Sequence, residues 1–178
     1  MTDQMKKSTS NFWVITLMIC VAAFVRLLPH PPNFAPIAAM ALFGGAYFNR
    51  KAFAFAIPLF AILLTDAIIG FYPFAFIVYV SLAVIVLLGI VMLKKVSVKN
   101  VMLASVTASA SFFIITNFGV WAFGTLYPKT PAGLMESYIA AIPFFHNTLI
   151  SDLFYAGIMF GVYELIKHKV PALQKVRA

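Results

Sequence analysis

Six long apolar stretches dominate this 178-residue chain, and they constrain its fold more than any other feature. They cover residues 12–28, 36–48, 52–70, 73–93, 101–124 and 149–166. Most of them approach the roughly 20 residues that a helix needs to cross a bilayer. The composition agrees, because 63% of the residues are hydrophobic and only 10% are charged. We therefore predict an all-α, polytopic membrane protein with six transmembrane helices in a single integral membrane domain, residues 1–178.

The basic residues predict how these helices are oriented, because Lys and Arg favour the cytoplasmic side of a membrane. With the N-terminus inside, the short stretch 36–48 must also cross, since otherwise most later basic residues would move outside. Both termini are therefore predicted to be cytoplasmic, and only Arg26 and Lys129 lie on the outer side. The predicted inner basic residues are Lys6, Lys7, Arg50, Lys51, Lys94, Lys95, Lys99, Lys167, Lys169, Lys175 and Arg177.

The net charge of +8 is explained by this inner surface, where anionic lipid headgroups attract Lys and Arg. The lipid bilayer is therefore a predicted partner, and nucleic acid is not. The chain has no glycine-rich phosphate loop, and its single cysteine, Cys20, excludes a CxxC motif. We predict no cofactor and assign no catalytic residue.

Three ionisable residues, Arg26, Asp66 and Asp152, lie inside or at the ends of apolar stretches and map to the outer side. A charge in hydrocarbon costs roughly 2.5 to 3.5 kcal/mol, so it is usually retained because something pairs with it or binds it. Asp66 would lie at a helix C-terminus, where the helix dipole disfavours an anion. Asp152 would lie one turn into a helix that Asn147 or Thr148 could cap. An Arg26–Asp66 ion pair and contact with a ligand are both open interpretations.

Two predicted outer loops, residues 29–35 and 125–148, are unusual. The first is rich in proline, which removes backbone donors and favours an extended chain. The second is far longer than a helical hairpin needs and has apolar residues of its own. Long loops of that kind usually act as lids or binding loops. We therefore predict an outer mouth covered by two structured loops.

Polar and aromatic residues gather at the same end of the predicted bundle. Asn117 and Trp121 lie four positions apart, so on a helix they would share one face. An amide and an indole that point into one cavity would suit a small planar ligand. The alternatives are a helix-bridging role for Asn117 and a place in the interfacial aromatic belt for Trp121.

The predicted ligand site combines these groups into one outer pocket. Arg26 and Lys129 would attract an anionic or polar small molecule, whose apolar faces Phe34 would help to cover. The candidate ligand-binding residues are Arg26, His30, Asn33, Asp66, Asn117, Trp121, Tyr127, Lys129, His146, Asn147 and Asp152. No metal site is assigned, because the spacing of the candidate ligands matches no local metal motif. The alternative divalent-metal site would use His30, His146, Asp66 and Asp152.

Small residues in 35–45 and 104–109 would allow helices to approach closely. Internal packing is the simplest explanation, and docking of a partner membrane protein is the alternative.

Several blocks of the sequence resemble the signature of an uncharacterised family of small bacterial inner-membrane proteins. They are residues 26–47, 64–66, 117–121, 127–134 and 140–152, which are distributed over most of the length of the chain. In size, helix number and loop placement the chain is also distantly similar to the substrate-binding S components of energy-coupling-factor (ECF) vitamin transporters. This similarity implies an S-component-like bundle, a vitamin-like or polar ligand, and an energising transmembrane and ATPase module as partner.

We therefore predict a membrane-embedded protein that binds or transports a small molecule near the outer face. One alternative is a structural or assembly protein of the bacterial envelope, and a second is a component for divalent-metal uptake. A third is an intramembrane enzyme that uses Asp66 and Asp152 as acid and base. A cavity of roughly 300 Å³ or more beneath the outer loops would favour a ligand carrier over a scaffold.

Overall fold

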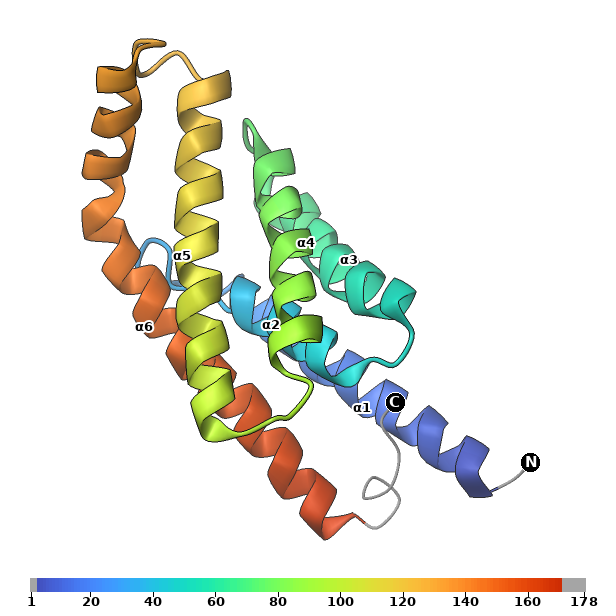
Figure 1. Cartoon of the computed structure of the whole chain (residues 1–178). Helices are drawn as coiled ribbons and strands as arrows, with labels where there is room; N and C mark the ends of the chain where they lie inside the picture. The colour runs from blue at the N-terminus through green and yellow to red at the C-terminus, as the bar shows by residue number, and fades with distance from the viewer. Residues whose placement is uncertain (1–2, 171–178) are drawn as a thin grey trace.

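The computed structural model describes residues 3–170, with side chains from residue 9 onward, and this part of the chain contains helices and no strands. Figure 1 shows α5 and α6 as a long hairpin, while α1 and α3 run obliquely away from it and α2 lies between them. The six helices are α1 (Asp3–Val25), α2 (Ile37–Tyr47), α3 (Lys51–Ile69), α4 (Ala75–Met92), α5 (Val98–Phe123) and α6 (Pro131–Lys169). The predicted all-α class and the six helices are confirmed.

Four helices, α3 to α6, are long and apolar enough to cross a membrane. The other two contain shorter apolar segments, Thr9–Val25 in α1 and Ile37–Tyr47 in α2. The structure therefore supports four spans by length, where the sequence predicted six. Large apolar side chains such as Trp13, Phe60 and Leu165 are more than 60% exposed, as expected where the solvent is lipid.

Helix α2 is too short to span a bilayer, and it lies inside the protein. Its eight residues from Ala38 to Gly45 are all buried, and it packs against each of the other five helices. A helix that is apolar on every side belongs in a core. Eleven residues rise only about 16 Å at 1.5 Å per residue, so the chain that enters α2 must begin inside the bundle.

Glycines let α2 and α4 approach closely, which confirms internal packing as one use of the small residues in α2. A Cβ atom on Gly89 of α4 would lie 2.6 Å from the Leu42 carbonyl oxygen. A Cβ atom on Gly45 would collide with the Val86 carbonyl oxygen in the same way. Neither position can accept a side chain without moving a helix backbone.

The predicted loop 125–148 is wrong, because α6 begins at Pro131 and continues without interruption to Lys169. Thr130 caps the helix by accepting a hydrogen bond from the Gly133 backbone N–H, and Pro131 occupies the first turn. Pro143 lies inside the helix, and the orange part of α6 bends in Figure 1. Only residues 124–130 connect α5 to α6.

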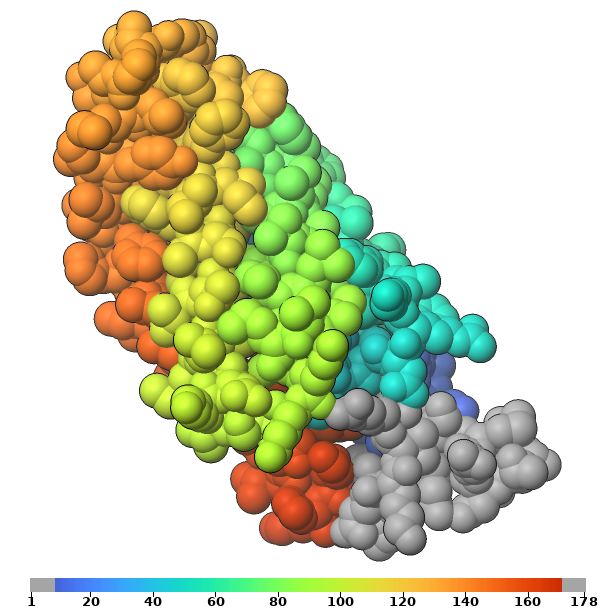
Figure 2. Space-filling model, viewed as in Figure 1, coloured from blue at the N-terminus to red at the C-terminus, as the bar shows by residue number. Residues whose placement is uncertain are grey.

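The bundle has an upper end and a lower end, which carry different loops. The upper end carries the α3–α4 connection, residues 70–74, and the α5–α6 connection, residues 124–130, both at the top of Figure 1. The lower end carries residues 48–50 and 93–97. In the space-filling view, α4 and α5 lie side by side across this face of the molecule (Figure 2).

Candidate functional site

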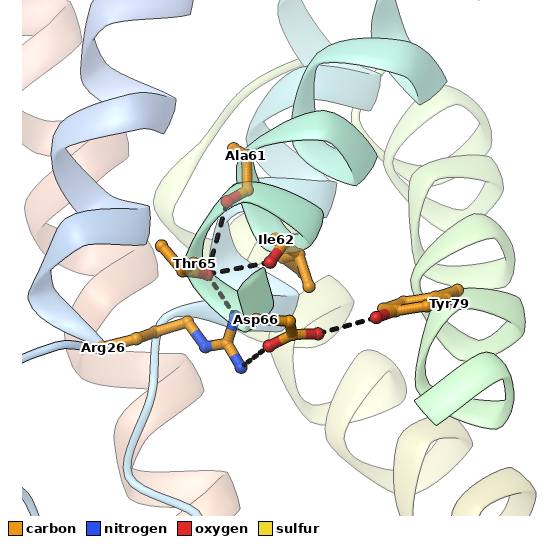
Figure 3. Close-up of polar contacts among 6 residues, drawn as sticks. All are labelled: Arg26, Ala61, Ile62, Thr65, Asp66 and Tyr79. Carbon is orange, nitrogen blue, oxygen red and sulfur yellow. Dashed lines mark hydrogen bonds and ion pairs between the residues drawn. The ribbon is translucent and has the colours of Figure 1, made fainter. Parts of the chain in front are cut away.

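The first polar cluster joins the end of α1 to the last turns of α3 (Figure 3). Arg26 Nη2 lies 2.7 Å from Asp66 Oδ1, and Arg26 Nη1 donates to Thr65 Oγ1 at 2.5 Å. The Tyr79 hydroxyl of α4 donates to Asp66 Oδ2 at 2.9 Å. The side chains of the ion pair are 8% and 1% exposed, so the pair is almost completely shielded. The structure therefore contains the Arg26–Asp66 ion pair, one of the two interpretations that the sequence leaves open.

Each member of this cluster has a local reason to be there. α1 ends at Val25, so Arg26 leaves the helix where its side chain can turn toward α3. Asp66 lies in the last turn of α3, where the helix dipole disfavours a carboxylate and a cation offsets that cost. Thr65 donates back to the Ile62 carbonyl at 2.9 Å, which leaves its oxygen free to accept from Arg26.

The second buried carboxylate, Asp152, has a different environment. It lies midway along α6, is 2% exposed, and accepts a hydrogen bond of 2.6 Å from Ser109 of α5. The prediction that Asp152 lies near a helix start is wrong, because α6 begins 21 residues earlier, at Pro131. Among the side chains that the structure describes, those of residues 9–170, no Lys, Arg or His lies within salt-bridge distance of Asp152.

The proline-rich loop between α1 and α2 packs against the middle of α6. Ser151 donates to the Ala35 carbonyl at 3.1 Å, and Asn147 donates to the Pro32 carbonyl at 3.0 Å. Phe34 packs with its ring 5.7 Å from that of Tyr155. Asn147 and Phe34, both predicted to contact a ligand, therefore hold the loop in place.

A cavity of about 780 Å³, the upper cavity, opens between this loop, the end of α3, and the upper halves of α5 and α6. Its wall combines an ion-pair face, amide and hydroxyl groups, and aromatic rings. It is lined by Arg26, Leu27, His30, Asn33, Ala35, Ile37, Ile68, Ile69, Tyr72, Val78, Phe112, Phe113, Thr116, Asn117, Ala141, Phe144, Phe145 and Thr148.

A smaller space of about 50 Å³, the deep cavity, lies against Asp152. Its remaining wall residues are Asn33, Ala35, Ile37, Ala38, Phe112 and Thr148. All of these except Ala38 also line the upper cavity, so the two cavities adjoin each other. Residues of the proline loop and the buried carboxylate therefore line the same small cavity.

Four of the predicted ligand residues line the upper cavity, namely Arg26, His30, Asn33 and Asn117. The side-chain amide of Asn117 donates a hydrogen bond of 2.8 Å to the Phe113 carbonyl of the same helix. Asn33 has a positive φ of 60°, a conformation that Asn tolerates better than most residues.

Trp121 and Lys129 do not line the upper cavity, contrary to the prediction. The Trp121 indole N–H donates to the Pro128 carbonyl at 2.9 Å. Lys129 donates to the carbonyls of Trp121 and Gly124 at the C-terminus of α5. A cation there neutralises the negative end of the helix dipole, so both side chains stabilise the α5–α6 connection.

Tyr127 and His146 also lie outside the cavity lining, and His146 is exposed. The four residues of the alternative metal site are not brought together. Within the described part of the chain, no three His, Cys, Asp or Glu residues form a group that could hold a metal ion.

Sequence reasoning missed three residues that complete these sites. Tyr79 and Ser109 each donate to a buried carboxylate, and Tyr72 lines the upper cavity. Tyr72 lies in the α3–α4 connection. Its partial burial raises the pKa of its hydroxyl, and the nearby Asp66 carboxylate raises it further. It therefore remains a neutral hydrogen-bond donor. Ser109 had a usable signal, because a hydroxyl within an apolar stretch needs a partner.

The chain belongs to a family of unknown function (DUF6580), whose model matches residues 6–173. This confirms membership of an uncharacterised family. No curated protein and no solved structure matches the chain, so the expected similarity to the S components of ECF transporters has no support from these comparisons.

Proposed function

We propose that this protein is a membrane-embedded binding component for a polar small molecule. The observation that carries the proposal is the upper cavity, whose volume of about 780 Å³ exceeds the roughly 300 Å³ expected of a ligand site. A scaffold would fill such a space with side chains, because protein interiors are normally close-packed.

The wall of the cavity suits a ligand with polar edges and an apolar body. Thr116 and Asn117 offer hydroxyl and amide groups from α5, and His30 offers an imidazole from the proline loop. Phe112 and Phe144 supply flat apolar surfaces on two helices. Ligand sites commonly combine apolar walls with a few such polar groups.

The charge of the ligand differs from the sequence-based hypothesis. The charge of Arg26 is neutralised by Asp66, and Lys129 donates hydrogen bonds to backbone carbonyls outside the cavity. These two residues therefore offer no free positive charge to an anion. The proposal favours a neutral polar or cationic ligand over an anionic one.

The proposal extends to transport across the bacterial inner membrane, with both termini in the cytoplasm and the upper end facing outward. This orientation rests on the distribution of Lys and Arg. In one form of the proposal, the protein works like an S component of an ECF transporter, and an energising transmembrane and ATPase module completes it.

The test compares two variants that differ in one position on α6. Ala141 lines the upper cavity, whereas the neighbouring Ala140 is exposed and does not. Wild type, Ala141→Trp and Ala140→Trp are purified gently, and small molecules released on denaturation are identified by mass spectrometry. We expect a stoichiometric metabolite from wild type and Ala140→Trp, and its loss from Ala141→Trp.

Recovery of only lipid from all three folded proteins would contradict the proposal and favour the envelope scaffold. Equal recovery of the metabolite from both Trp variants would place the ligand elsewhere than in the upper cavity.

A further inference from the structure

Asp152 is a buried carboxylate that has no counter-charge in the described part of the chain. It is 2% exposed, and its hydrogen bond comes from the neutral hydroxyl of Ser109. Among the side chains of residues 9–170, no basic group forms an ion pair with it, whereas Asp66 pairs with Arg26. An ionised carboxylate at this depth is strongly disfavoured unless a positive charge binds beside it.

The deep cavity provides a place for such a charge. Its volume is about 50 Å³, and Asp152 forms part of its wall. A water molecule occupies about 30 Å³ in the liquid, so the space accommodates a compact ion or a primary ammonium group. It excludes a quaternary ammonium group with its bulky methyl substituents. The upper cavity adjoins it, because the two cavities share five wall residues.

Part of the wall of the deep cavity is made of chain that is not helical. Asn33 and Ala35 belong to the proline-rich loop, which Ser151 and Asn147 hold against the middle of α6. Irregular backbone at membrane depth is tolerated where it lines a cavity, and its carbonyl groups are common ligands for monovalent cations in membrane proteins. Thr148 adds a hydroxyl to the same wall.

We propose that the deep cavity binds a compact monovalent cation against the carboxylate of Asp152. The cation is Na⁺ or the primary ammonium group of a ligand that extends down from the upper cavity. The positive charge neutralises the carboxylate, and oxygen atoms of the proline loop replace part of its hydration shell. The Na⁺ form goes beyond the function proposed above, because it requires no organic ligand.

The experiment measures the thermal stability of the purified protein in detergent at constant pH and ionic strength. Sodium chloride, methylammonium chloride and choline chloride are exchanged for one another. At a tenfold excess over the dissociation constant we expect the Tm to rise by roughly 3 to 6 °C relative to choline. The rise must saturate with concentration and disappear in Asp152→Asn. Glu164→Gln serves as the control, because Glu164 is an acidic residue of the same helix that does not line the deep cavity.

The salts separate the two sources of the charge. A rise with sodium assigns the site to a free ion, and a rise with methylammonium alone assigns it to an organic ammonium group. Equal stability in all three salts would overturn the proposal, as would a sodium effect that persists in Asp152→Asn. If Asp152→Asn does not fold, retention of radioactive ²²Na⁺ by immobilised wild-type protein, with and without excess methylammonium, decides the question. No retention, together with no methylammonium-dependent rise in Tm, would overturn it.

Discussion

The two buried carboxylates of this protein, Asp66 and Asp152, differ in how their charge is compensated. Asp66 accepts hydrogen bonds from the Arg26 guanidinium and from the Tyr79 hydroxyl, so each carboxylate oxygen has a donor. Asp152 accepts a hydrogen bond from the Ser109 hydroxyl and lies against a small cavity. Burial is almost complete at both residues, so burial by itself does not indicate the role of an intramembrane acid. The counter-charge distinguishes a closed structural pair from an open site.

Position along the helix explains the difference. Asp66 is in the last turn of α3, near the point where the chain leaves α1 and Arg26 becomes available. Asp152 lies midway along a 39-residue helix, where an arginine from either end would have to be buried at full length. Instead, the proline-rich loop packs against α6 beside Asp152, and a small cavity remains between them.

The largest effect is expected from breaking the closed pair. Arg26→Met removes the cation and leaves Asp66 buried without a counter-charge, which should lower the free energy of unfolding by about 3 to 5 kcal/mol. Unfolding in mixed detergent micelles measures this change. The double variant with Asp66→Leu removes both charges and should recover most of the loss. A double variant as unstable as the single one would show that the pair does not act as a unit.

Part of this comparison could be predicted from the sequence. The depths of Arg26 and Asp66, together with the dipole argument, were sufficient to suggest their pairing, and the structure contains it. The isolation of Asp152 could not be predicted, because it depends on which residues of α5 and the proline loop face α6. Hydropathy gives depth in a membrane but no rotation about the helix axis.

The fold was predictable to a similar degree. Apolar stretches located the six helices, whereas α6 was predicted to begin too late. The prolines at positions 128 and 131 suggested a loop that continued to residue 148, although Thr130 followed by Pro131 is also a helix-start signal. The early start of α6 matters, because Ala141, Phe144 and Phe145 line the upper cavity as helix residues.

A smaller effect is expected at the open site when its hydrogen bond is removed. Ser109→Ala deprives Asp152 of its hydroxyl donor and should destabilise the protein by about 1.5 to 3 kcal/mol, the range for hydrogen bonds to charged groups. Ser105→Ala is the matched control, since Ser105 lies one turn earlier, is equally buried, and has no partner for its hydroxyl. Similar losses in both variants would assign the effect to packing.

A weaker effect is expected from Tyr79→Phe in the closed pair. The substitution removes one donor from Asp66, but Arg26 continues to neutralise the carboxylate, so we expect a loss of about 1 kcal/mol. Tyr155→Phe is the control, because among residues 9–170 the Tyr155 hydroxyl forms no hydrogen bond, while its ring packs against Phe34. A loss above that of Ser109→Ala would mean that Tyr79, rather than Arg26, dominates the environment of Asp66.

The smallest change in stability is expected from Asp152→Asn, measured in choline chloride. This substitution keeps the shape and an oxygen that can accept from Ser109, and it removes a charge that has no counter-charge in the described residues. The free energy of unfolding should therefore stay within about 1 kcal/mol of wild type. Asp66→Asn should lose several times as much, because it leaves Arg26 buried and unpaired. Equal losses at the two positions would show that Asp152 is compensated as completely as Asp66, and the distinction between a closed pair and an open site would fail.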